Sequence, residues 1–134
     1  MVVSSFDVYL NRILKDIEYR KNVDYESRMS VRKFNAAYKR IINNISMIEM
    51  HYPEQKPTFL DMLTHEDNAV AYNIAWLILQ RPFFTLDEKR CALNVIKTLY
   101  YEKKLEHLID KAILHLIIPE WDERLNGTGD APLS

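Results

Sequence analysis

The segment from residue 58 to residue 80 constrains the fold of this chain more than any other. A short apolar run, Phe59 to Leu63, leads into a polar turn, Thr64 to Asn68, and then into the alanine-rich stretch Ala69 to Leu79. This last stretch is apolar nearly all round, which is typical of a helix buried between neighbours. The segment therefore predicts two helices folded back on each other, the unit of a stacked helical architecture.

The placement of glycine and proline extends this prediction to the whole chain. Both glycines, Gly127 and Gly129, lie among the last eight residues, so the rest of the chain lacks the residue most used in tight hairpin turns and phosphate-binding loops. Prolines fall where helical patterns start or stop, at Pro53, Pro57, Pro82 and Pro119. We expect an all-α protein of about six helices in antiparallel hairpins, arranged as an α-solenoid or an irregular bundle.

Two amphipathic stretches occupy the first half of the chain. The first helix, predicted from about Ser5 to Arg20, has one apolar face made of Phe6, Leu10, Ile13, Leu14 and Ile17. The second helix, from Ser30 to about His51, has a seam at alternating spacings of three and four: Val31, Phe34, Tyr38, Ile41, Ile45, Ile48 and Tyr52. A coiled-coil dimer has the same spacing, but Ile42 and Met47 beside the stripe favour a bundle helix.

The second half opens with a helix-start signal. Thr85 and Glu88 have the spacing of a capping box, which predicts a helix beginning there. Apolar residues continue to Leu99, and after a break near residues 103–104 a last helix runs from Leu105 to Ile117. We expect a short turn over residues 120–125 to close a single domain of residues 1–125, with residues 126–134 as a flexible tail.

Size, charge and hydropathy exclude several classes of protein. The chain has 134 residues, is 48% hydrophobic and carries a net charge of -1, so no overall field attracts it to nucleic acid or to an anionic membrane. The start of the chain lacks the pattern of a signal peptide, and the longest apolar stretch is well short of the roughly 20 residues that span a bilayer. We expect a soluble, cytoplasmic protein.

The residue types that most often carry catalysis or bind metal are scattered. The four histidines, His51, His65, His107 and His115, form no cluster with the spacing of metal ligands, and we expect them to be capping or solvated. Cys91 excludes an intramolecular disulfide and lies in a helical pattern, which predicts a small buried residue. No P-loop, nucleophile-elbow or zinc-finger motif occurs. We therefore predict no enzyme activity, no metal and no cofactor.

Charge is nevertheless unevenly distributed along the chain. Residues 1–50 hold nine basic and six acidic side chains, whereas residues 101–134 hold four basic and seven acidic. An acidic surface beside an exposed aromatic ring suits a basic protein partner, because charge steers the encounter and the ring anchors the complex. The candidate partner-binding residues are Glu102, Glu106, Asp110, Glu120, Trp121, Asp122 and Glu123.

Two other interpretations of the charges stay open. The first three of these acidic residues recur every four positions, so they form a stripe if the helix is continuous there. In the first interpretation this stripe is an ordinary solvated helix face, on which nearby lysines pair with the carboxylates. The basic first half offers a nucleic-acid surface instead, made of Arg28, Arg32, Lys33, Lys39 and Arg40 with Tyr25 or Tyr38 stacking on bases. Apolar residues interrupt these cations, and Tyr38 belongs to the seam.

The apolar pattern from Val31 to Leu79 resembles HEAT-type helical repeats. The residues that carry the resemblance are Phe59, Leu60, Leu63, His65, Asp67, Val70, Ala71, Ile74, Ala75 and Leu79. Placed after the seam helix, the pattern also looks like a family of small bacterial proteins with HEAT-like folds, some of which are immunity proteins. The resemblance implies a binding scaffold that neutralises a cognate toxin by covering its active site; a nucleic-acid-associated regulator is the alternative.

Overall fold

The computed structural model describes residues 5–20, 28–105 and 111–127. Of these residues 87% are helical, and they form six α-helices and no β-strand, so the predicted all-α fold is confirmed. Contacts divide the chain into two compact units, residues 1–62 and residues 63–134. The single domain predicted over residues 1–125 stays a prediction.

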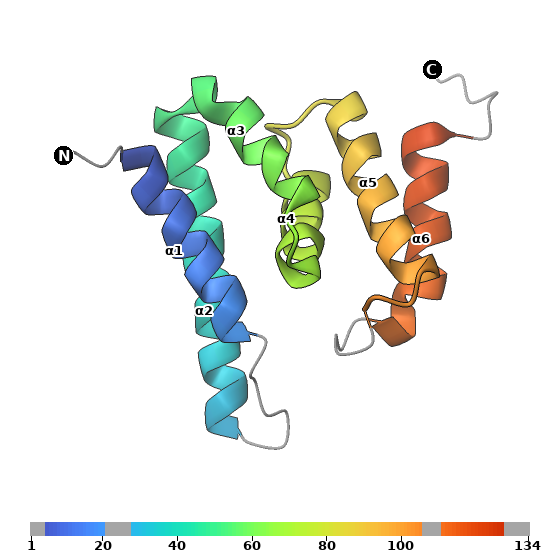
Figure 1. The fold of residues 1–134 in the computed structure, drawn as a ribbon, viewed down its shortest axis with the longest axis horizontal. Coiled ribbons are helices and arrows are strands. Elements are labelled where there is room, and N and C mark those ends of the chain that lie inside the picture. Colours follow the sequence, from blue (N-terminus) through green and yellow to red (C-terminus); the bar gives the residue numbers. More distant parts are fainter. Residues whose placement is uncertain (1–4, 21–27, 106–110, 128–134) are drawn as a thin grey trace. The chain divides into compact units, whose positions relative to one another are not determined.

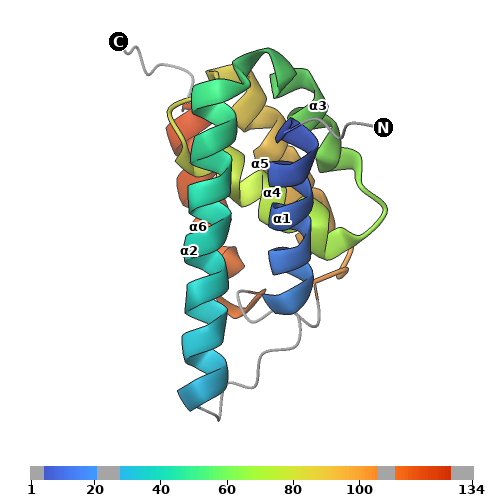
Figure 2. The ribbon, with the colours of Figure 1, turned by 90° about the vertical axis from the view of Figure 1, so that its left-hand side faces the viewer.

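The first unit is built on a pair of antiparallel helices. Helices α1 (Ser5–Arg20) and α2 (Arg28–His51) lie side by side in both views (Figures 1 and 2), within two residues of the predicted bounds. Most residues of the two predicted faces are buried, and the core of the pair consists of Phe6, Leu10, Ile13, Ile17, Ala37, Ile41, Ile45 and Ile48. Leu14, Phe34 and Tyr52 are half-buried, and the side chain of Val31 lies outside the described residues. Tyr38 lies at the edge of this face and is 38% exposed, while its neighbour Ala37 is fully buried.

Two prolines open the short elements that follow α2. The 3-10 helix η1 (Pro53–Gln55) and helix α3 (Lys56–Leu60) each have proline in the first turn, where a missing N–H leaves no hydrogen bond unmade. Tyr52, at the break, packs against Phe6 with ring centroids 6.5 Å apart. The 3-10 helix η2 (Asp61–Thr64) contains the boundary between the two units. The folding back of residues 58–80 on themselves therefore stays a prediction.

The second unit contains three successive antiparallel helices, α4 (Asn68–Gln80), α5 (Leu86–Tyr101) and α6 (Lys111–Asn126) (Figure 1). Helix α4 begins where the Asp67 carboxylate accepts a hydrogen bond from the amide of Ala69 at 2.9 Å. As predicted, α4 is buried around most of its circumference, through Val70, Ala71, Tyr72, Ile74, Ala75, Leu77, Ile78 and Leu79.

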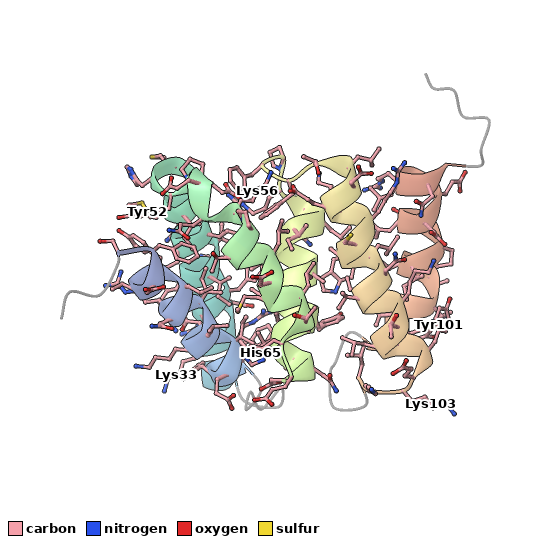
Figure 3. The ribbon with its side chains drawn as sticks, turned by 45° about the horizontal axis from the view of Figure 1, so that its top comes forward. Lys33, Tyr52, Lys56, His65, Tyr101 and Lys103 are labelled. Carbon is pink, nitrogen blue, oxygen red and sulfur yellow. The ribbon has the colours of Figure 1, made fainter. Side chains whose placement is uncertain are left out.

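The start and the end of α5 match the sequence signals. The capping box is present: the Thr85 amide donates to Glu88 Oε1 at 2.7 Å, and the Glu88 amide donates to Thr85 Oγ1 at 3.2 Å. The helix ends in a Schellman motif, in which Lys103 adopts a left-handed φ of 58° and the Lys104 amide donates to the Leu99 carbonyl at 2.9 Å. Figure 3 shows Tyr101 and Lys103 at this end of α5.

Helix α6 departs from the prediction at both ends: Leu105, which was expected to begin the last helix, is not helical, and the helix does not stop at Pro119. We expected the helix to stop there and residues 120–125 to form a turn, and that expectation is wrong: α6 continues through Pro119 to Asn126. Pro119 is exposed, whereas Leu125 beyond it is 7% exposed, so burial after the proline compensates for the hydrogen bond that it removes. Gly127, with a φ of 68°, ends the helix by donating its amide to the Glu123 carbonyl at 2.8 Å. Among the described helices, none has the length and apolar character needed to cross a bilayer.

Candidate functional site

The first group of predicted partner-binding residues, Glu102, Glu106 and Asp110, was expected to form an acidic stripe on one helix. That stripe required a continuous helix, but α5 ends at Tyr101 and Glu102 occupies its C-cap. The exposed carboxylate of Glu102 instead pairs with Lys104, with 3.0 Å between Oε1 and Nζ. Glu106 and Asp110 lie outside the described residues.

The second group lies on α6, where most of the charge is neutralised locally. Glu120 pairs with Arg124 at 3.1 Å, one turn away, and Asp122 pairs with Lys97 of α5 at 3.0 Å. Asp122 also accepts a hydrogen bond from Asn126 Nδ2 at 2.7 Å. The bond from Lys97, followed by that from Asn126, lowers the pKa of the Asp122 carboxyl below its ordinary value. These pairs support the interpretation of an ordinary solvated face, although Lys97 and Arg124 were not among the expected partners.

Trp121 is half-buried, whereas an exposed ring was expected. Because α6 continues beyond Pro119, it carries Trp121 against α4, where the ring meets Trp76 edge to face with centroids 6.2 Å apart. The Arg124 guanidinium lies 4.6 Å from the centre of the Trp121 ring. Trp76 is held in turn by Tyr72, again edge to face at 6.2 Å. We name Glu120, Trp121, Glu123 and Arg124 the Trp121 surface.

The basic residues of the first unit are also partly engaged. Arg40 binds Asp16, a residue not singled out in the sequence, through Nη2 at 2.7 Å and Nε at 3.1 Å. This hydrogen bond raises the pKa of Arg40 against the opposing effect of burial. The Arg20 guanidinium lies 5.1 Å from the centre of the Tyr38 ring, so one face of this predicted stacking residue is covered. Arg32, Lys33 and Lys39 are exposed, while Tyr25 and the side chain of Arg28 lie outside the described residues.

The described residues of each unit line a groove. The groove between α1 and α2 has a volume of about 580 Å³ and is lined by charged side chains, among them Arg12, Lys15 and Arg40. The groove of the second unit is smaller, about 290 Å³, and its lining residues, which include His65, Asn68 and Asn94, carry no acidic or permanently basic side chain. The first groove is therefore the one suited to a charged ligand.

The residues considered for metal binding and catalysis do not assemble in the described part of the chain. The Nδ1 atom of His65 accepts a hydrogen bond at 3.0 Å from the amide of Asp67, the N-cap of α4, and His51 and His115 are exposed. His107 lies outside the described residues, and within them no group of three or more histidine, cysteine, aspartate or glutamate side chains is placed to hold a metal ion.

Cys91 is exposed, so the prediction that it is buried is wrong. The buried face of α5 consists of Ala92, Leu93, Ile96 and Leu99, and position 91 falls outside that face. Its neighbour Arg90 donates to the Leu125 carbonyl at 3.0 Å, which couples α5 to the end of α6.

Comparison with models of protein families, with curated proteins and with solved structures gave no match. The resemblance to HEAT-like proteins stays a prediction, and the candidate site rests on the geometry of the two units.

Proposed function

We propose that this chain is a non-catalytic protein-binding module and that the Trp121 surface is where the partner binds. The supporting observation is the way in which the Trp121 ring is held. Trp76 contacts it from one side and Arg124 covers it at 4.6 Å, while part of the ring stays exposed. Tryptophan and arginine are the residue types that most often dominate binding energy at protein interfaces.

Immobilisation of the ring supports this role. A side chain that is already ordered loses little conformational entropy when a partner covers it, so more of the contact energy contributes to affinity. The rim of the surface is polar, with the exposed Glu123 and the Glu120–Arg124 pair beside the ring. A central aromatic ring with a charged rim is the usual anatomy of a binding patch.

We further propose that the partner is a bacterial toxin and that the chain acts as an immunity protein by covering the toxin's active site. The HEAT-like pattern of the sequence supports this assignment, together with the exposed Glu123 on α6. Because Glu120 and Asp122 already have basic partners, the ring should contribute more to affinity than the net charge does. The association rate should therefore depend only weakly on salt.

The product of the gene neighbouring this one is the partner to test. The two tryptophans of the chain, Trp76 and Trp121, contact each other, so their fluorescence reports directly on this surface. Titration with the neighbouring product should change that fluorescence and inhibit any toxic activity. Trp121→Ala should weaken the complex by about 30-fold or more, as expected for an interface anchor.

The matched control is Tyr101→Ala. Tyr101 is an aromatic side chain of the same unit that is 64% exposed, so its removal tests whether any exposed ring would have the same effect. Equal loss of affinity in both variants, or none in either, would contradict the proposal. If Trp121→Ala proves unfolded by circular dichroism, Glu123→Arg on the same surface replaces it, because an exposed charge is changed without loss of packing.

The nucleic-acid alternative gains no support from a specific contact. Arg40 is engaged by Asp16, and Tyr38 is covered on one face by Arg20. Binding of an RNA or DNA oligonucleotide that is lost in Arg32→Glu, while Trp121→Ala binds normally, would nevertheless favour that alternative.

A further inference from the structure

We propose that the groove between α1 and α2 binds an acidic segment of a partner protein through Arg12, Lys15 and Arg40. The groove belongs to the first unit and has a volume of about 580 Å³, which lies within the usual range of ligand clefts. It shares no residue with the Trp121 surface, so this inference stands or falls independently of the role given to that surface.

Asp16 orients Arg40 at the groove. Asp16 is 8% exposed, and its carboxylate accepts hydrogen bonds from Nε and Nη2 on one edge of the Arg40 guanidinium. A guanidinium has five N–H donors, so Nη1 and one hydrogen of Nη2 stay available while the buried carboxylate fixes the plane of the group. The Arg40 side chain is 51% exposed, and these donors are accessible to a ligand in the groove that it lines.

The other charges of the lining favour an anionic ligand. Arg40 neutralises the charge of Asp16. The remaining charged groups of the lining are the two cations Arg12 and Lys15 and the carboxylate of Glu18. Arg12 and Lys15 are both exposed on α1. Lys33 is also exposed, and it lies seven residues before Arg40, two turns away along the same side of α2. Lys33 lies outside the lining, in which the three cations Arg12, Lys15 and Arg40 outnumber the two carboxylates of Asp16 and Glu18.

The same groove is less suited to a nucleic acid. The carboxylate of Glu18 is part of the lining, and a phosphate backbone carries a negative charge at every nucleotide. The rings of Phe34 and Tyr38 are covered by the Arg20 guanidinium, at 4.1 and 5.1 Å from their centroids, so neither presents both faces to bases. An acidic segment that has neutral residues among its carboxylates can contact the cations and place no charge at Glu18.

The test uses the full chain and blocked six-residue peptides of glutamate or glutamine as probes. Calorimetry at low ionic strength should show saturable binding of the glutamate peptide and none of the glutamine peptide. Lys15→Gln and Arg12→Gln should each weaken binding by about two- to fivefold, as expected for exposed charge contacts. Lys39→Gln is the matched control, because it removes the same charge from an exposed position of α2 that does not line the groove.

Three outcomes would overturn the proposal. Equal weakening by Lys15→Gln and Lys39→Gln would show that only the general field of the unit attracts the peptide. Equal binding of the glutamine peptide would show that charge is irrelevant. Tighter binding of a six-nucleotide RNA than of the glutamate peptide would assign the groove to nucleic acid. The substituted positions are all exposed, so the variants should fold as the parent chain does.

Discussion

The carboxylate of Asp16 and the guanidinium of Arg40 join α1 to α2 across 24 residues of sequence, with 2.7 Å between Oδ1 and Nη2. Asp16 is the one charged residue in the buried set of the described residues, and it occupies the margin of an otherwise apolar face. A charge at that place is stable only when paired, so the contact also favours a single register of the two helices.

Removing the arginine should therefore cost more than removing the pair. Arg40→Met leaves the Asp16 carboxylate buried without its main partner, and we expect a loss of about 1–3 kcal/mol in the free energy of unfolding. The double variant Asp16→Asn with Arg40→Met should lose less than the sum of the two single losses. Urea unfolding of all four proteins measures the coupling, and Lys39→Met is the control for an exposed cation. Additive losses would show that the pair contributes nothing specific.

The two helical faces provide a second prediction. Ile45 and Ile74 are both 0% exposed, one in each unit, so Ile45→Ala and Ile74→Ala should each destabilise the chain by about 2–5 kcal/mol. Leu116 is 65% exposed, and Leu116→Ala should cost less than about 0.5 kcal/mol. Losses of similar size in all three variants, measured by chemical denaturation, would contradict the assigned cores.

The turn after α5 offers a stabilising substitution. Lys103 has a φ of 58°, a conformation in which a β-carbon is strained and glycine is not. We expect Lys103→Gly to raise the free energy of unfolding by about 0.5–1 kcal/mol. Glu102→Gly, at a φ of -85°, gains nothing from the same change and serves as the control. Thermal unfolding measures the stability of both variants. Equal effects would show that the left-handed conformation of Lys103 is not the cause of the gain in stability.

Elements that depend on local patterns were predictable from the sequence, and those that depend on tertiary contacts were not. The bounds of α1, the burial of α4 and the Thr85 capping box follow from side-chain periodicity and from one cap, all within a few turns of chain. Pro119 has the same local signal as a helix end, yet burial of Leu125 beyond it keeps α6 intact. Asp16 offered a weak signal, since its position borders the apolar face of α1.

The candidate site shows the same division. The candidate residues on α6 are neighbours in sequence, but Lys97, the partner of Asp122, lies on another helix and 25 residues away. The orientation of Trp121 depends on Trp76, which no spacing rule connects to it. The acidic residues of α6 therefore carry less free charge, and the Trp121 ring is less exposed, than the sequence predicts.

Cys91 gives a direct check of one corrected position. Because its side chain is exposed on α5, a thiol reagent should label the native protein to completion without denaturant. Leu93→Cys in a Cys91→Ser background is the control, since Leu93 is 1% exposed on the same helix and should react only after unfolding. Slow labelling of native Cys91, at the rate of the control, would show that the position is protected.

The Lys97–Asp122 contact makes the free energy of unfolding depend on pH in the acidic range. The pKa of Asp122 is lowered in the folded state by hydrogen bonds from Lys97 and then from Asn126. A carboxyl group whose folded pKa lies below its unfolded value stabilises the fold above that unfolded value, near pH 4, and the contribution is lost as the pH falls through the folded pKa.

In Lys97→Met, the pKa of Asp122 should rise toward its ordinary value, but only in part, because the Asn126 bond remains. Carboxyl carbon resonances followed from about pH 6 to about pH 2 measure this shift, and stability should fall less steeply with acid in the variant. Lys104→Met, which removes the partner of Glu102 instead, should leave the Asp122 titration unchanged. An identical titration of Asp122 in the parent chain and in Lys97→Met would show that the contact across α5 and α6 does not set its pKa.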